Sequence, residues 1–241
     1  MKTGAELVAD IDAARPASGE AALWWMGQAS FVVKLGDAVI YVDPFLTAVE
    51  GRRVPPLVSP ADVWHAAAVL GTHDHIDHID RGAWPAIAGA APQAVFVVPD
   101  LVREGLVRDL GIAANRFRGM DHLRTVRVGD VAITGVAAAH ELLDRDEATG
   151  QFPYLGYVIE GNGVTLYHAG DCCIWEGLQA ALSRWRFDVM MLPINGRDAR
   201  RLRAGCIGNM TYQEAADLAG ALRPGVVIPC HFDMFGGNTE D

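Results

Sequence analysis

The sequence Thr72-His73-Asp74-His75-Ile76-Asp77-His78 places three histidines and two aspartates in one short stretch. The whole chain of 241 residues has only 8 histidines, so chance is a poor explanation for this spacing. Three buried imidazoles without partners would each carry a desolvation cost, whereas a divalent cation satisfies all of them and keeps them neutral. We therefore interpret His73, His75, Asp77 and His78 as metal ligands rather than as a solvated histidine-rich loop.

The motif His73-x-His75-x-Asp77-His78 resembles the signature of the metallo-β-lactamase superfamily. Later segments match the same family in the same order, at His140, Gly170-Asp171 and His231. A narrower resemblance is to the branch of metal-dependent hydrolases named after L-ascorbate 6-phosphate lactonase. It rests on Trp25-Met26-Gly27-Gln28, the segment from Leu166 to Asp171, Asn195-Gly196-Arg197-Asp198, Gly208-Asn209-Met210 and the segment from His231 to Phe235.

The resemblance implies a binuclear metal centre that catalyses hydrolysis. One ion would take His73, His75 and His140, a second would take Asp77, His78 and His231, and Asp171 would bridge the two. Imidazole and carboxylate ligands suit zinc, with manganese as the alternative. Two cations that share a water lower its pKa from about 15.7 toward ~7, which yields a hydroxide nucleophile at neutral pH.

Further site residues are expected around these ligands. Asp77 is expected to be a ligand first and a general base second. His168 either donates a proton or orients Asp171, or it is a structural histidine; the sequence leaves both open. Asp43, at the end of an apolar run, is either a cap or the orienting partner of a metal-bound histidine. Cys172 and Cys173 directly follow Asp171, and we expect both to behave as small buried hydrophobes without a catalytic role.

The segment from Asn195 to Met210 concentrates four arginines in a chain whose net charge is −10. Solvated arginines are the simplest interpretation. The alternative is that Arg197 grips an anionic substrate bidentately, with Asn195 and Asn209 completing the substrate-binding set.

The order of elements predicts an α/β fold. Hairpins are expected at 22–34 with 38–42, at 125–128 with 131–136, and at 154–160 with 164–167. Further strands are expected at 66–70, 94–98, 189–193 and 226–229, and helices at 81–88, 102–110, 175–185 and 211–222, the last with a capping box at Thr211 and Glu214. Together with the resemblance this indicates a metallo-β-lactamase-like four-layer αββα sandwich, two mixed sheets with helices outside. We expect residues 1–21 to be an accessory segment and residues 22–241 the hydrolase domain, with a short C-terminal end.

Composition limits the function classes. With 51% hydrophobic and 21% charged residues the chain can build a sizeable core. We expect a cytoplasmic protein without a structural disulfide, because no signal peptide or membrane-length apolar run is present. The negative charge argues against nucleic acid or an anionic membrane as partner. We expect a small-molecule substrate, anionic if the arginines of the segment 195–210 bind it, and leave a homo-oligomer open. The leading function is hydrolysis of an ester or lactone; a phosphodiesterase and a catalytically silent metal-binding module remain alternatives.

Overall fold

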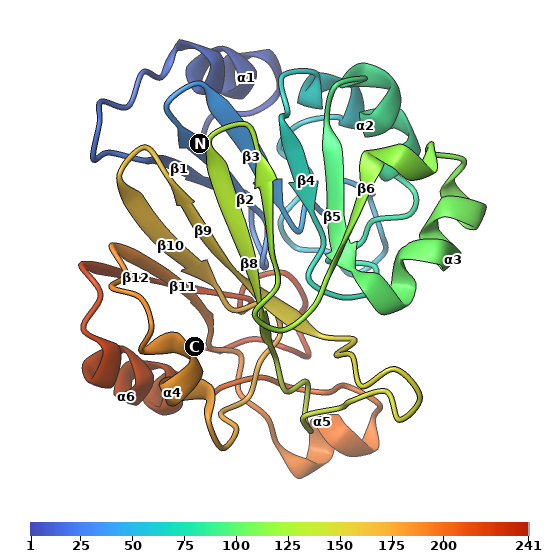
Figure 1. Cartoon of the computed structure of the whole chain (residues 1–241). Helices are drawn as coiled ribbons and strands as arrows, with labels where there is room; N and C mark the ends of the chain where they lie inside the picture. Colours follow the sequence, from blue (N-terminus) through green and yellow to red (C-terminus); the bar gives the residue numbers. More distant parts are fainter. Residues whose placement is uncertain (241) are drawn as a thin grey trace.

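The computed structural model describes residues 1–240, in which two six-stranded sheets pack face to face between outer helices (Figure 1). The first sheet has the order β1 (Ala22–Trp25), β2 (Phe31–Leu35), β3 (Ala38–Val42), β4 (Ala68–Leu70), β5 (Val95–Pro99) and β6 (Phe117–Met120). The second has the order β12 (Val226–Cys230), β11 (Val189–Pro193), β10 (Val164–His168), β9 (Leu155–Gly161), β8 (Val131–Ala137) and β7 (Thr125–Val128). Both sheets are mixed. In the first, β1 to β3 pair antiparallel and β3 to β6 pair parallel. In the second, β7 to β10 pair antiparallel and β10 to β12 pair parallel.

The central strands are largely apolar because both faces of each sheet are covered there, whereas the edge strand β7 has exposed Thr125 and Arg127. In β2, Phe31 and Val33 point into the core between the sheets, where they join residues such as Ile133 and Tyr157. Val32 points the other way, into the core under the helices. This alternation explains why all five residues of β2 are buried, and it confirms the predicted αββα sandwich.

Helices cover the outer face of each sheet (Figure 1). The first sheet is covered by α1 (Gly4–Ala13), α2 (Trp84–Ala90) and α3 (Asp100–Leu110), and the second by α4 (Leu178–Leu182) and α6 (Tyr212–Leu222). The predicted capping box of α6 is confirmed: Thr211 Oγ1 accepts from the Glu214 amide, and Glu214 Oε2 accepts from the Thr211 amide at 2.9 Å. None of the helices within residues 1–240 is long and apolar enough to cross a membrane.

Helix α1 belongs to the predicted accessory segment of residues 1–21. Its Leu7 and Ile11 are buried in the core between the first sheet and the helices. Lys34 of β2 reaches α1 and donates to the Ile11 carbonyl at 2.8 Å. The segment is therefore tied to the sandwich by apolar packing and by a buried hydrogen bond, and its treatment as a separate unit stays a prediction.

The structure corrects three predicted elements and adds one. Residues 22–34 are not one strand, because Gly27 and Gln28 adopt left-handed φ values of 90° and 53° and turn the chain back. The predicted helix 175–185 shrinks to α4, since Gly177 at φ 103° cannot continue a helix. The loop 195–208 contains α5 (Ala199–Arg203), which Asp198 caps through two amides at 2.8 and 2.9 Å. Strand β6 was not anticipated.

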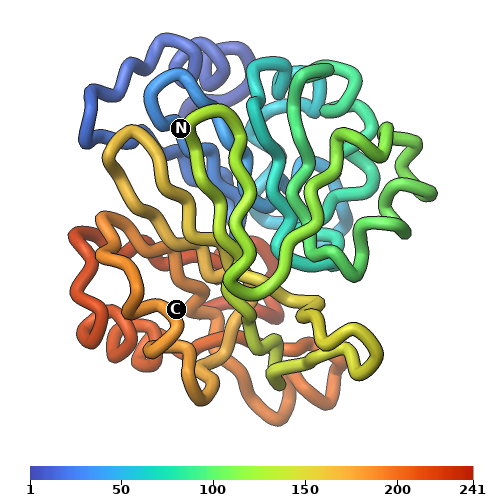
Figure 2. The backbone as a smooth tube through the Cα atoms, in the orientation of Figure 1, coloured from blue at the N-terminus to red at the C-terminus, as the bar shows by residue number. Residues whose placement is uncertain are grey.

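Long connections gather at one end of the sandwich. Figure 2 shows the connection between β8 and β9 (residues 138–154) projecting from the lower end, where α5 also lies. The ligand-type residues predicted from the sequence follow strands at this end.

Candidate metal centre

Each ligand-bearing segment begins just after a strand ends. His73 follows β4, His140 follows β8, Asp171 follows β10 and His231 follows β12. Sites at the carboxyl ends of strands are the usual arrangement in layered α/β proteins. The structure thus brings together side chains that are up to 158 positions apart, counted from His73 to His231.

The first group of ligand-type side chains consists of His73, His75, His140 and Asp171. One candidate ligand atom from each lies within 4.8 Å of the others. His73 Nε2 is 2.9 Å from His75 Nδ1, and His140 Nε2 is 3.7 Å from Asp171 Oδ2. Three of the four are buried and His75 is partly exposed, so the group is open on one side.

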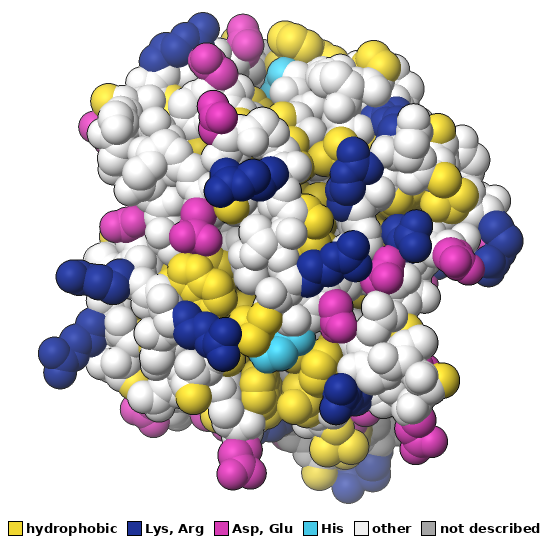
Figure 3. Space-filling model, in the orientation of Figure 1, with side chains coloured by type: hydrophobic (Ala, Val, Ile, Leu, Met, Phe, Trp, Pro, Cys, Tyr) yellow, Lys and Arg dark blue, Asp and Glu magenta, His cyan; other side chains and the backbone are white. Residues whose placement is uncertain are grey.

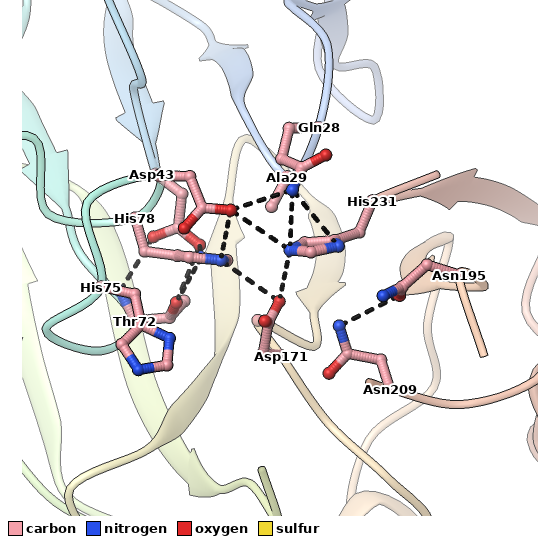
Figure 4. A network of polar contacts seen from close by, with 12 residues as sticks. Gln28, Ala29, Asp43, Thr72, His75, His78, Asp171, Asn195, Asn209 and His231 are labelled. Atoms are coloured by element: carbon pink, nitrogen blue, oxygen red, sulfur yellow. Dashed lines mark hydrogen bonds and ion pairs between the residues drawn. The ribbon is translucent and has the colours of Figure 1, made fainter. Parts of the chain in front are cut away.

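The second group consists of Asp77, His78 and His231. Figure 4 shows His78 and His231 of this group on either side of Asp171. Asp77 Oδ2 lies 3.6 Å from His78 Nε2 and 3.4 Å from His231 Nε2. Asp171 Oδ1 lies 3.2 and 3.0 Å from the same two nitrogens. Asp171 therefore turns one oxygen to each group, the geometry expected of a bridging carboxylate.

Unpaired buried atoms test whether these residues fit a metal. His78 Nε2 and Asp171 Oδ1 are buried and have no hydrogen-bond partner. Buried polar atoms are nearly always paired by hydrogen bonds, whereas these two meet only as an ion pair at 3.2 Å, which leaves ligand positions that a cation could take. Neutral imidazole and ionised carboxylate are ligands that zinc and manganese accept. The residues present fit a divalent cation.

The two groups differ in protonation. Burial holds the pKa values of His73, His75 and His140 below their ordinary value, so these imidazoles are neutral at pH 7 and ready to ligate. For His78 and His231 burial acts in the same direction, but the carboxylates of Asp171 and Asp77 outweigh it. They raise the pKa of His78 well above its usual range and that of His231 to about 9.

The two carboxylates respond to the same attraction. Burial alone would raise the pKa values of Asp77 and Asp171, yet the neighbouring His78 and His231 hold both below the usual range. At neutral pH the second group therefore pairs ionised carboxylates with protonated imidazoles. The protons occupy positions that a cation would take.

Asp43 resolves an alternative that the sequence left open. Its Oδ2 lies 2.6 Å from His78 Nδ1 and accepts from Thr72 Oγ1 at 2.8 Å, while Oδ1 accepts from the Thr72 amide at 2.8 Å. All of these groups are buried. Asp43 is thus the orienting partner of His78, and it fixes the ring so that Nε2 faces the second group.

Sequence reasoning missed the roles of Gln28 and Tyr154. Gln28 Nε2 donates to Asp77 Oδ2 at 2.9 Å and lies 3.1 Å from His231 Nε2. The Tyr154 ring packs at 5.3 Å from the His73 ring and 5.2 Å from the His140 ring, measured between centroids. Gln28 lies in one of the segments that carry the narrower resemblance, but neither residue has a local signal that predicts a contact across the fold.

The contacts of His168 favour its structural interpretation. Its Nε2 lies 2.8 Å from the Ala29 carbonyl, and its Nδ1 accepts from the Gly170 amide at 3.1 Å. Both ring nitrogens are thus engaged with backbone groups, and the side chain is fully buried. No ring nitrogen remains to donate a proton to a substrate or to orient Asp171.

The contacts of Arg197 also differ from the expected substrate role. Its two terminal nitrogens form a bidentate ion pair with Glu214 at 2.6 and 2.7 Å, and Nη1 also donates to the Asn209 carbonyl at 3.0 Å. The guanidinium fork that was expected to grip an anion is occupied by a carboxylate of α6. Arg197 therefore fastens the segment after β11 to the start of α6.

Asn195 and Asn209 lie beside Asp171 in Figure 4, and both are fully buried. Asn209 Nδ2 donates to Asn195 Oδ1 at 3.1 Å, and Asn195 Nδ2 donates to Asn238 Oδ1 at 2.7 Å. Arg201 donates to the Asn195 carbonyl at 2.5 Å. These contacts link Asn209, which lies beside Asp171, to Asn195 and through Arg201 to α5.

A cavity of about 610 Å³ lies at the far end of this amide chain. Its lining includes Arg200 and Arg201 of α5, together with Phe235, Gly236 and Asn238 of the C-terminal segment. Arg201 is paired with Asp198 at 2.6 Å. The Arg200 guanidinium, in contrast, makes no hydrogen bond or ion pair to the residues that the structure describes. Within the described residues the cavity thus offers one uncommitted cation, and it meets the amide chain at Asn238.

The cysteines next to the site are buried and reduced. Burial raises the pKa of Cys172 to about 12, and it also raises the pKa of Cys173. Both thiols are therefore protonated at neutral pH and are neither nucleophiles nor good metal ligands in that state.

A family model described as the beta-lactamase superfamily domain matches residues 39–232. A UPF0173 metal-dependent hydrolase of Koribacter versatilis is 32% identical over 215 residues, which cover 88% of this chain and 84% of the relative. A UPF0173 metal-dependent hydrolase of Pyrobaculum arsenaticum is 29% identical over 211 residues, with the same two coverages.

Solved structures share the fold at lower identity. Igni18, a metallo hydrolase from Ignicoccus hospitalis, superposes with a TM-score of 0.67 at 23% identity, covering 92% of this chain and 86% of that one. An isothiocyanate hydrolase from Delia radicum gut bacteria superposes with a TM-score of 0.66 at 19% identity, covering 91% of this chain and 88% of that one. CmlA, a diiron β-hydroxylase from Streptomyces venezuelae, superposes with a TM-score of 0.66 at 18% identity, covering 90% of this chain and 46% of that one. The fold therefore carries more than one chemistry among these proteins.

Proposed function

Because the chain belongs to the beta-lactamase superfamily and is a metal-dependent hydrolase, we propose that it binds two divalent cations and hydrolyses a small anionic ester or lactone. The observation that carries the proposal is the convergence of seven ligand-type side chains into two groups that share Asp171. Seven ligands are too many for one tetrahedral ion. The narrower lactonase-like resemblance supplies the ester or lactone as substrate class, and zinc or manganese as the metal.

Different residues of the site would bind the cations, orient a ligand and act as general base. Two bound cations would lower the pKa of a shared water and polarise a carbonyl. His73, His75 and His140 are neutral and offer lone pairs without first losing a proton. Asp43 holds His78 in one orientation. Asp77 is a ligand, and it is also the carboxylate that we assign as general base.

The anionic character of the substrate is supported by the cavity at Asn238, whose side chain accepts from Asn195. Among residues 1–240 no side chain pairs with the guanidinium of Arg200, which lines this cavity, whereas Arg197 is paired with Glu214. We therefore assign the recognition of a substrate carboxylate or phosphate to Arg200. On the face shown in Figure 3 basic and acidic side chains are interspersed, without a continuous basic surface of the kind that nucleic acids require.

Turnover by the metal-loaded protein tests the proposal. A simple lactone, the same lactone bearing a carboxylate, and bis(p-nitrophenyl) phosphate should be compared with zinc and with manganese. We expect hydrolysis of both lactones and a lower KM for the carboxylated one. Preference for the phosphodiester would establish the phosphodiesterase alternative instead, and two bound ions without turnover of any ester would indicate a silent metal-binding module.

Arg200→Ala tests the assignment of the anion. A charged hydrogen bond is worth roughly 1.5–3 kcal/mol, and solvent screening of an exposed arginine favours the lower end, or about tenfold in KM for the carboxylated lactone. Arg203→Ala removes an exposed arginine of the same helix that does not line the cavity, and it should leave KM unchanged. Equal KM changes for neutral and carboxylated lactones in Arg200→Ala would remove Arg200 from the binding role.

A further inference from the structure

Gln28 is a buried amide in contact with the second group of ligand-type residues. The residue is 1% exposed, and its Nε2 donates to Asp77 Oδ2 at 2.9 Å. The same nitrogen lies 3.1 Å from His231 Nε2. Figure 4 shows the Gln28 side chain pointing toward His231. Gln28 thus touches two of the three members of this group from the opposite sheet to His231.

The Asp77 oxygen that Gln28 contacts is the one that faces the cluster. Asp77 Oδ2 lies 3.6 Å from His78 Nε2 and 3.4 Å from His231 Nε2. A cation shared by these residues would therefore contact Oδ2. A carboxylate oxygen has two lone pairs, so it can accept from Gln28 and ligate a cation at the same time. The donor consequently fixes the rotation of the carboxylate without occupying its ligand position.

The backbone around Gln28 is built to hold this side chain in place. Gln28 has a left-handed φ of 53°, which a residue with a side chain rarely adopts. Its amide donates to Asp233 Oδ1 at 2.8 Å, and its carbonyl accepts from the His231 amide and from Trp25 Nε1, each at 3.0 Å. Strained conformations of this kind persist where the surroundings impose them, and they cluster at functional sites.

The first group has no equivalent support. Among the hydrogen bonds of residues 1–240, the ring nitrogens of His73 and His75 contact only each other and Thr72, and those of His140 have no partner. No side-chain amide of residues 1–240 donates to the imidazoles of this group. An effect of Gln28 on ligand orientation is therefore confined to the second group.

From these contacts we propose that Gln28 is a positioning residue of the second metal site, which holds Asp77 Oδ2 toward the cation and so raises the affinity of the Asp77, His78 and His231 group. The inference rests on the proposed two-cation function. Partners that orient metal ligands in this way typically contribute 10- to 100-fold to metal affinity.

Titration of the metal-free full-length protein with cobalt(II), followed by calorimetry and visible absorption, tests the assignment. Gln28→Met removes the donor but keeps an unbranched side chain of similar length. It should weaken the second cobalt-binding event by about 10- to 100-fold and leave the first within about threefold. His140→Ala removes a ligand of the first group only. The cobalt-binding event that weakens in this variant is therefore the one that belongs to the first group.

Gln93→Met is the matched control. Gln93 is exposed, and its side-chain amide donates to the carbonyls of Trp64 and Ala66, neither of which is a ligand-type residue. It should change neither event. Two unchanged events in Gln28→Met, or equal weakening of both, would overturn the positioning role while leaving the two-cation proposal intact. A wild-type protein that takes up a single ion would refute the two-cation proposal and the role of Gln28 with it.

Discussion

Uptake of the second cation should release protons, whereas uptake of the first should not. The imidazoles of the first group have pKa values below 6.5 and are neutral at pH 7. In the second group the pKa of His78 lies well above its usual range and that of His231 is about 9, so both carry a proton at pH 7 when no cation is bound. A cation can only bind these nitrogens after both protons have left.

The structure sets the magnitude of this linkage. Two protons displaced per ion would make the affinity of the second group rise by up to about 100-fold per pH unit, or ~2.7 kcal/mol at 1.36 kcal/mol per proton. A cation already on Asp171 would weaken the attraction that holds the two protons. We therefore expect one to two protons, and 10- to 100-fold per unit, for the second ion between pH 7 and 8. The affinity of the first group should not change over this range.

Zinc titrations by calorimetry provide the assay. At one pH, the apparent binding enthalpy is measured in buffers of different ionisation enthalpy, and the slope gives the number of protons released in each event. Repeating the measurement at pH 7 and 8 gives the two affinities. The reasoning is refuted if the second event releases no proton, or if both events release the same number.

Three further predictions follow from the same contacts. Without metal, the unfolding free energy should fall as pH rises from about 6.5 toward 9, because a histidine with a raised folded pKa loses its stabilisation as pH rises through that value; denaturant melts at constant ionic strength that show a rise would contradict this. Asp171→Ala should lower the occupancy of both groups, since Asp171 turns an oxygen to each; elemental analysis showing the loss of a single ion would exclude bridging. Cys172→Ser should leave kcat/KM within about tenfold of the parent, because its thiol is protonated at pH 7; a loss of ~10³-fold in an ester assay would place the thiol in catalysis.

The local features of the fold could be predicted from the sequence. The Gly129-Asp130 turn between β7 and β8 and the capping box before α6 depend on residues within a few positions of each other, and both were predicted correctly. The break between β1 and β2 could not be predicted in the same way. Residues 22–34 are almost continuously apolar, and the left-handed Gln28 in their midst depends on partners more than 200 positions away.

In the candidate site, too, the residue types could be predicted from the sequence, whereas their long-range contacts could not. The seven ligand-type residues were named from a motif and a resemblance, and the structure brings all of them together. The role of Arg197 could not be foreseen, because the spacing of arginines does not indicate which carboxylate a guanidinium will meet. Glu214 takes both of its terminal nitrogens. Sequence identifies groups that can bind, but the fold decides which of them are already bound.

The backbone at the site suggests why these residues tolerate strain. Gln28, Asp43 and His231 all have left-handed φ values, of 53°, 46° and 60°, and each lies within three residues of the end of a strand. A left-handed residue costs about 1–3 kcal/mol, so three of them within one cluster oppose folding. Each directs a side chain at the second group: Gln28 contacts Asp77, Asp43 contacts His78, and His231 contacts both Asp77 and Asp171. A cation that binds only the folded form would offset this cost by mass action. The strained turns are therefore expected to be the part of the protein that a bound metal stabilises most, and amide hydrogen exchange at these three turns should slow on metal binding more than exchange in the central strands.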